Sequence, residues 1–202
     1  MGIKSKVLIS LSIFVLLYGG YYLGVPAILN SSNSTEFLKS YIQKEYGFNT
    51  QIVNPHIKMG FLPSVWVKSG AFKILNSDST SALELKNVNA KIRLLPLILS
   101  KAEITHFSAD DLKINLIFDK NSQLKLGQYP LIGMSQPKVN IHQAVLKIGG
   151  YNVNLFDELK NKNIILNGSY FTLFDFVDNK RIKFATDAEL FVGAKTSKIK
   201  AD

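Results

Sequence analysis

Apolar and polar residues alternate along most of the chain from residue 49 to the end, and this alternation constrains the fold more than any other feature. It is clearest in ALELKNVNAKIRLLPLILSKAEITHFSADDLKINL, residues 82–116. Because successive side chains of a β-strand point to opposite faces, such segments have one apolar face that needs cover. The pattern predicts strands at 49–55, 64–75, 82–94, 102–108, 111–118, 138–148, 151–156, 163–174 and 181–192.

Turn-forming residues separate several of these segments. Gly149-Gly150, Asn167-Gly168 and Asp178-Asn179 are typical of turns, and Asp110-Asp111 is predicted to shift the strand register like a bulge. The sequence therefore predicts a mainly β domain over residues 49–202, built as a meandering, mostly antiparallel sheet.

Composition limits the chain to one such domain and an appendage. The 202 residues, 47% of them hydrophobic, suffice for one core. The absence of cysteine excludes disulfides, thiolate metal sites and a thiol nucleophile.

The appendage is residues 1–30, where Val7 to Leu29 form a run of 23 residues without charge. As a helix this run would measure roughly 34 Å, enough to cross a hydrocarbon core of about 30 Å. Lys4 and Lys6 precede it, so we expect a signal-anchor with a cytoplasmic N-terminus and the remainder across the membrane. A signal peptide cleaved after the V-x-A arrangement at 25–27 is the alternative.

Residues 31–48 are expected to form a linker and a short amphipathic helix. Asn33 and Glu36 have the spacing of a capping box, and Gly47 is placed to end the helix. Its apolar stripe is expected to pack on the β domain, with a membrane-surface helix as the alternative. The stripe consists of Phe37, Leu38, Tyr41 and Ile42.

The sequence offers little for catalysis or for a metal. His56, His106 and His142 are far apart, and the acidic pairs Asp110-Asp111 and Asp157-Glu158 are typical of turns and surfaces. Phosphate-loop, dinucleotide-binding and zinc-protease motifs are absent. We therefore expect no catalytic site, no metal, no cofactor and no enzyme activity.

The chain is basic, with 24 Lys and Arg against 15 Asp and Glu, and only two of these lysines lie in the first 30 residues. The remaining surplus of seven positive charges is dispersed along the strands. No nucleic-acid motif appears, so nucleic acid is not an expected partner. Anionic lipid head groups or an acidic envelope surface fit the charge better.

Two long segments carry a family resemblance: GFLPSVWVKSGAFKIL at 60–75 and SALELKNVNAKIRLLPLILSKAEITHFSADDLKINLIFDKN at 81–121. Preceded by a lysine-flanked membrane helix and a helix of the TEFLKSYIQKEYG type, they resemble the N-terminal region of the AsmA family. These bacterial envelope proteins are related to the larger TamB and YhdP-like proteins. Residues 1 to about 121 carry the resemblance, and 138–202 match only as further strands.

The resemblance implies an inner-membrane anchor and a periplasmic β-sheet bent into a half-pipe, or taco-like groove. It also implies a role in outer-membrane biogenesis or phospholipid movement, with acyl chains lying against the apolar strand faces. The candidate groove residues are Leu83, Leu85, Val88, Ile92, Ile104, Phe107, Leu112, Ile114 and Leu116.

The same alternation also permits a closed β-sandwich, in which these side chains pack against a second sheet. The protein would then be an envelope scaffold that binds another protein by strand addition.

Overall fold

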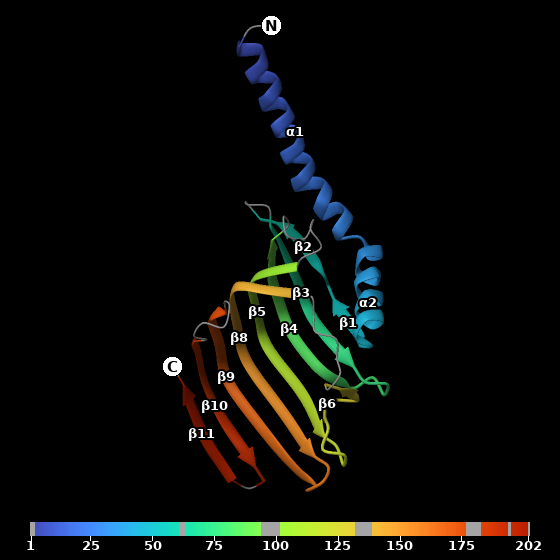
Figure 1. The fold of residues 1–202 in the computed structure, drawn as a ribbon, viewed down its shortest axis with the longest axis vertical. Helices are drawn as coiled ribbons and strands as arrows, with labels where there is room; N and C mark the ends of the chain where they lie inside the picture. Colours follow the sequence, from blue (N-terminus) through green and yellow to red (C-terminus); the bar gives the residue numbers. More distant parts are fainter. Residues whose placement is uncertain are drawn as a thin grey trace.

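The computed structural model describes residues 3–60, 64–93, 102–131, 139–176, 183–193 and 195–201. Two helices, α1 (Ile3–Leu29) and α2 (Ser32–Tyr46), precede the strands (Figure 1). The strands are β1 (Asn49–Val53), β2 (His56–Met59), β3 (Ser64–Leu75), β4 (Ser81–Arg93), β5 (Ala102–Phe118), β6 (Leu124–Leu126), β7 (Tyr129–Pro130), β8 (Val139–Asp157), β9 (Lys162–Phe176), β10 (Lys183–Val192) and β11 (Lys195–Ala201).

All described strands belong to one eleven-stranded sheet, which confirms the mainly β prediction. Its order is β1-β3-β4-β5-β8-β9-β10-β11; β2 also pairs with β3, and the short β6 pairs with β5 and β7. Figure 1 shows the long strands side by side in a single curved layer. Within the described residues no second sheet covers this layer, so they form an open bent sheet and not the closed sandwich.

The sheet is mixed, and the predicted antiparallel pairing is correct except between β5 and β8. β5 and β8 pair in parallel, while all other neighbouring strands in the described part of the sheet are antiparallel. Parallel neighbours need a crossover connection of about a dozen residues or more, and residues 119–138 supply one. A period-2 pattern cannot reveal this, because it is the same for both pairings.

The strands at the middle of the sheet are longer than the sequence suggested. The predicted strands 102–108 and 111–118 are one strand, β5, and 138–148 and 151–156 are one strand, β8. Gly149-Gly150 is therefore not a turn. A Cβ at Gly149 would lie 2.5 Å from the backbone oxygen of Asp110, so glycine allows β5 and β8 to approach each other closely.

The irregularity predicted at Asp110-Asp111 coincides with an interruption of strand pairing and not with a change of register: the ladder of β4 and β5 has no pairs between Lys86/Asp111 and Asn89/Ser108. β4 and β5 keep one register on both sides of Asp110, and the shift between these strands lies at Lys91/Ile92. The backbone irregularity near Asp110 lies on β4, where Asn87 has a φ of 49°. Asn87 donates a side-chain hydrogen bond to Asp110 Oδ2 at 2.7 Å, which ties the two strands at this point.

Cross-strand pairing sorts the side chains into apolar and polar rows that run across seven strands. Residues paired directly across a sheet share a face. One row is apolar throughout: Phe72, Leu85, Leu112, Tyr151, Gly168, Ala188, Ile199. A second is apolar except for its last member: Ile74, Leu83, Ile114, Val153, Leu166, Leu190, Ser197. The row between them faces the other way and is polar: Lys73, Glu84, Lys113, Asn152, Asn167, Glu189, Lys198.

The amphipathic helix is present, but three of the four residues of its apolar stripe do not pack on the domain, and only Ile42 is half-buried. α2 begins after Ser31 and not after Asn33, and it ends as predicted at Gly47, whose φ is 73°. Phe37 is 73% exposed, and Leu38 and Tyr41 are also exposed. α2 lies beside β1, an edge strand, and an edge offers a helix a much narrower contact than a sheet face does (Figure 1).

α1 is attached to the β domain at its C-terminal end. The Tyr22 hydroxyl donates to the Gly60 carbonyl at 3.0 Å. The Asn30 side-chain amide donates to the Ile57 carbonyl at 3.0 Å and accepts from the Ile57 N–H at 2.5 Å. Among the residues that the structure describes, no helix has both the length and the hydropathy needed to cross a membrane. The anchor at residues 1–30 stays a prediction.

Candidate functional site

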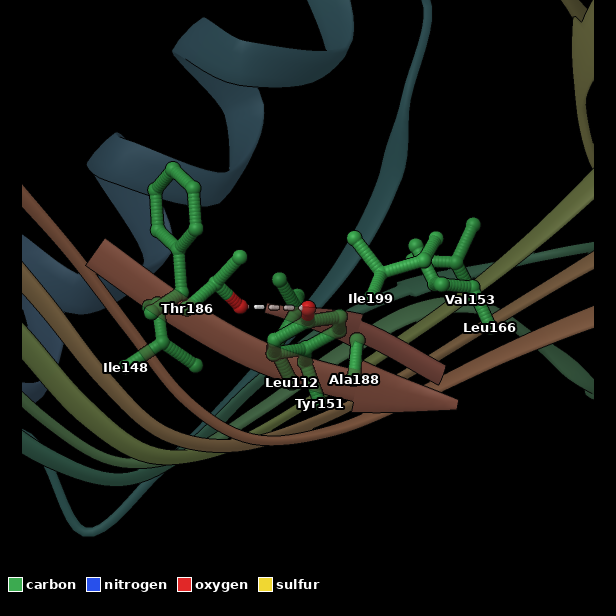
Figure 2. A pocket seen from close by; sticks show the side chains of 9 residues that line it. Leu112, Ile148, Tyr151, Val153, Leu166, Thr186, Ala188 and Ile199 are labelled. Carbon is green, nitrogen blue, oxygen red and sulfur yellow. Dashed lines mark hydrogen bonds between the residues drawn. The ribbon is translucent and has the colours of Figure 1, made fainter. Parts of the chain in front are cut away.

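An apolar hollow of about 320 Å³ lies on the concave face of the sheet (Figure 2). Five neighbouring strands, β5, β8, β9, β10 and β11, supply its lining. The lining residues are Leu112, Ile148, Tyr151, Val153, Leu166, Phe171, Thr186, Ala188 and Ile199. None of these side chains is charged.

A break in the strand alternation brings more apolar residues to this face than a regular sheet would. Ile148 and Tyr151 are three positions apart and Leu166 and Phe171 five, yet all four line the same hollow. Residues separated by an odd number should point to opposite faces. In β8 the alternation breaks at Gly149-Gly150, and β9 has a break between Leu166 and Phe171. The register between β9 and β10 shifts beside it, at Asp187/Ala188. Apolar side chains on both sides of the bend therefore point to the concave side.

The polar atoms on the hollow satisfy one another. Thr186 Oγ1 donates its single hydrogen to the Tyr170 carbonyl at 2.8 Å. The 2.7 Å bond between Tyr151 and Thr186, drawn in Figure 2, must then use the Tyr151 hydroxyl hydrogen. The hollow consequently presents hydrocarbon and aromatic surface to a ligand, with these two hydroxyls already paired.

Gly168 makes room for the Tyr151 ring. A Cβ at Gly168 would lie 2.0 Å from a carbon of that ring, so the ring occupies the place of a side chain on the neighbouring strand. Tyr151 also meets Phe171 edge to face, with ring centroids 6.3 Å apart. Tyr151 is therefore held in place in the hollow by packing and by its hydrogen bond.

The floor of the hollow is buried, whereas its walls stay accessible. Ile148 is 5% exposed and Ala188 3%, whereas Ile199 is 40% exposed and the remaining lining residues other than Thr186 are half-buried. Across the described residues no large side chain is completely buried. A single layer cannot bury both of its faces, so this apolar surface is open to a ligand or a partner.

The structure places the nine predicted groove residues in three settings, and all nine are half-buried. Leu112 lines the hollow, and Leu85 lies opposite it on β4. Three others, Leu83, Ile114 and Leu116, pack against a small closed cluster of Ile74, Ala82 and Leu126. The remaining four lie beyond the bend, where Ile92 pairs with Ile104, Phe107 with Ala90 and Val88 with Ser69. Their role in lipid binding stays a prediction.

Eight of the lining residues were missed, and all eight follow residue 140. The alternation in 163–174 and 181–192 was visible, but it did not indicate which neighbours these strands have. The parallel pairing of β5 with β8 places Leu112 opposite Tyr151, and this contact joins the two halves of the chain.

The opposite face carries the charges. Lys73 bonds Glu84 at 3.2 Å, and the Lys91 ammonium lies 5.4 Å from the Trp66 ring centroid. Trp66 also meets His106 edge to face. Partial burial, followed by the positive charges of Lys147 and Lys91, lowers the pKa of His106 below its ordinary value.

The histidines lie on separate strands, with His56 in β2, His106 in β5 and His142 in β8. In the part of the chain that the structure describes, no three His, Cys, Asp or Glu residues gather to hold a metal ion. Comparison with protein-family models, with curated proteins and with solved structures finds no match for this chain. The AsmA resemblance and the absence of enzyme activity stay predictions.

Proposed function

We propose that this chain is a periplasmic lipid-binding protein, anchored in a bacterial inner membrane, that holds phospholipid acyl chains on the concave face of its sheet. By doing so it helps to move phospholipid or supports outer-membrane biogenesis. The observation that carries the proposal is the uncharged row from Phe72 to Ile199, which crosses seven strands and ends at the hollow. Within the described residues, no second layer of the protein covers this row.

The size of the hollow sets the strength of the proposed interaction. Its 320 Å³ correspond to about ten water molecules at about 30 Å³ each, and a methylene group is of similar size. Burial of ten methylenes at about 0.8 kcal/mol each contributes on the order of 8 kcal/mol. The costs of association are of comparable size, about 4–15 kcal/mol. A ligand bound in this way exchanges readily, which suits transfer better than storage.

None of the described residues on the hollow offers an unpaired polar group, which supports a ligand recognised by its acyl chains. A head group would find no unpaired hydroxyl there, because Tyr151 and Thr186 bond each other. We therefore propose that the head group stays in water and that the protein distinguishes lipids by their acyl chains.

The N-terminal segment supports the proposed location. The uncharged run from Val7 to Leu29 and the resemblance to the AsmA family both favour an inner-membrane anchor with the β domain in the periplasm. The hydrogen bonds of Tyr22 and Asn30 would hold the sheet close to the membrane surface, where lipid is available.

Native mass spectrometry of the full chain, released from detergent micelles, tests the proposal. Two adjacent positions on β8 provide matched variants: Val153→Asp places a charge on the hollow, and Asn152→Asp places one on the polar face. Lipid that binds to the N-terminal segment is expected equally on the wild type and on both variants. The readout is therefore the difference in bound lipid between the variants. We expect one phospholipid fewer on Val153→Asp than on the wild type or Asn152→Asp. Equal lipid on the two folded variants would refute the proposal.

A further inference from the structure

The two edges of the sheet are protected to different degrees. At one edge the chain breaks between β1 and β2, where Asn54 has a φ of 49°, and α2 lies beside β1 (Figure 1). At the other edge β11 runs for seven residues, and every position except the last is exposed. Among the described strands β11 pairs only with β10. Its outer side therefore carries a row of backbone donors and acceptors without a strand partner.

We propose that β11 is the docking site for an extended segment of another protein in which acidic and apolar residues alternate. Such a segment adds to the sheet as one more strand and bonds β11 through its backbone. The proposal is independent of lipid binding, because it needs only the edge and its charges.

The side chains of β11 specify this alternation. Ile199 lines the hollow, so it marks the concave side, and Ser197 and Ala201 share that side by alternation. Lys198 and Lys200 point to the opposite side. Lys195, at the start of the strand, also lies on the concave side by this alternation. Over residues 197–201 an added strand would therefore meet small or apolar groups on one face and the ammonium groups of Lys198 and Lys200 on the other.

The charges on β11 indicate acidic residues in the partner. The strand carries three lysines and no acidic residue. Lys198 and Lys200 lie opposite Glu189 and Asp187 on the inner side, and the Lys198 side chain remains 84% exposed at 3.9 Å from Glu189. Opposite charges directly across two strands stabilise their pairing, so acidic residues fit positions opposite these lysines.

A second copy of the chain does not fit this edge. Two copies of β11 in fully overlapping antiparallel register would place Lys198 opposite its own equivalent, and like charges in that position destabilise the pairing. At the opposite edge of another copy, α2 lies beside β1, so that edge is less accessible to β11. The proposed partner is therefore not a second copy of this chain.

Fluorescence anisotropy with two nine-residue peptides, one alternating Val and Glu and one alternating Val and Lys, tests the proposal on the full chain in detergent micelles. We expect the acidic peptide to bind at least tenfold more tightly than the basic one. The double variant Lys198→Gln/Lys200→Gln removes both charges without placing like charges opposite Glu189 and Asp187, and it should abolish this preference. The matched variant Lys113→Gln/Lys147→Gln changes the charge equally on exposed positions of two central strands and should leave the preference unchanged.

Backbone methylation separates strand addition from simple charge attraction. Two versions of the acidic peptide carry N-methyl groups on alternate amides, in one frame or the other. In an added strand the amides of only one frame point at β11, so only that version of the peptide should lose binding. Exchange of the β11 amides that face away from β10 should slow only with the version that binds. Failure of the acidic peptide to bind, equal loss from both frames, or equal effects of the two double variants would overturn the proposal.

Discussion

Replacement of Gly168 by alanine tests whether the Tyr151 ring lies where the structure places it. In a strand, alanine normally stabilises relative to glycine by about 0.4–1 kcal/mol, because it restricts the unfolded chain. Here the new Cβ would lie 2.0 Å from the ring, so Tyr151 must move. Gly168→Ala is therefore expected to destabilise the protein, whereas glycine-to-alanine replacements in strands generally stabilise it.

The magnitude follows from two losses. Overpacking of a well-packed site costs about 1–3 kcal/mol. Displacement of the ring also breaks its hydrogen bond to Thr186, which contributes about 0.5–1.5 kcal/mol. After the general gain is subtracted, we expect Gly168→Ala to lower the free energy of unfolding by about 1–4 kcal/mol. A loss of 2 kcal/mol corresponds to a fall of about 4–8 °C in Tm for a chain of this length.

Urea unfolding of the full chain in micelles, followed by circular dichroism, measures this change. Gly70→Ala is the matched control, because a Cβ there meets nothing closer than 3.6 Å, and it should be neutral or stabilising. In a Tyr151→Ala background the cost of Gly168→Ala should disappear. A stabilising Gly168→Ala, or an equal cost with and without Tyr151, would refute the assigned packing.

Two further predictions concern pH. The lowered pKa of His106 means that the unfolded chain takes up a proton first as pH falls below about 6.5. Stability should therefore decline from that pH downwards, and His106→Gln should flatten the decline in Tm between pH 7 and 5. Lys125, 2.7 Å from Asp119, and backbone N–H groups of the same turn lower the pKa of Asp119. This contribution to stability is present above about pH 3.9 and is lost as pH falls further, so Asp119→Asn should reduce the acid sensitivity of Tm below pH 4. An unchanged pH profile in either variant would contradict the corresponding assignment.

Strands with a clear alternation were predictable from the sequence. The pattern gave β3 with its observed bounds and β4 within one residue of them. β11 was missed because KTSKIKA contains a single large apolar residue and therefore shows little alternation. Gly149-Gly150 was misassigned because glycine serves both turns and close approaches between strands, and only the position of β5 distinguishes the two.

The sequence predicted the apolar character of the candidate site but not its position in the sheet. The alternation in residues 82–116 correctly indicated an apolar strand face, but Leu83, Ile114 and Leu116 pack against the closed cluster around Leu126. The hollow lies further along the sheet because β8 joins β5 in parallel and because the alternation breaks next to Tyr151. Both are long-range effects of strand pairing, which local periodicity does not contain.

Site-specific photo-crosslinking in intact membranes tests the central claim most directly. Benzoylphenylalanine at Leu166 would lie on the hollow, and at the next residue, Asn167, it would lie on the polar face of the same strand. We predict that irradiation attaches phospholipid to the chain labelled at position 166 and leaves the chain labelled at position 167 free of lipid. Equal labelling at the two positions, or none at position 166, would contradict a lipid-binding concave face.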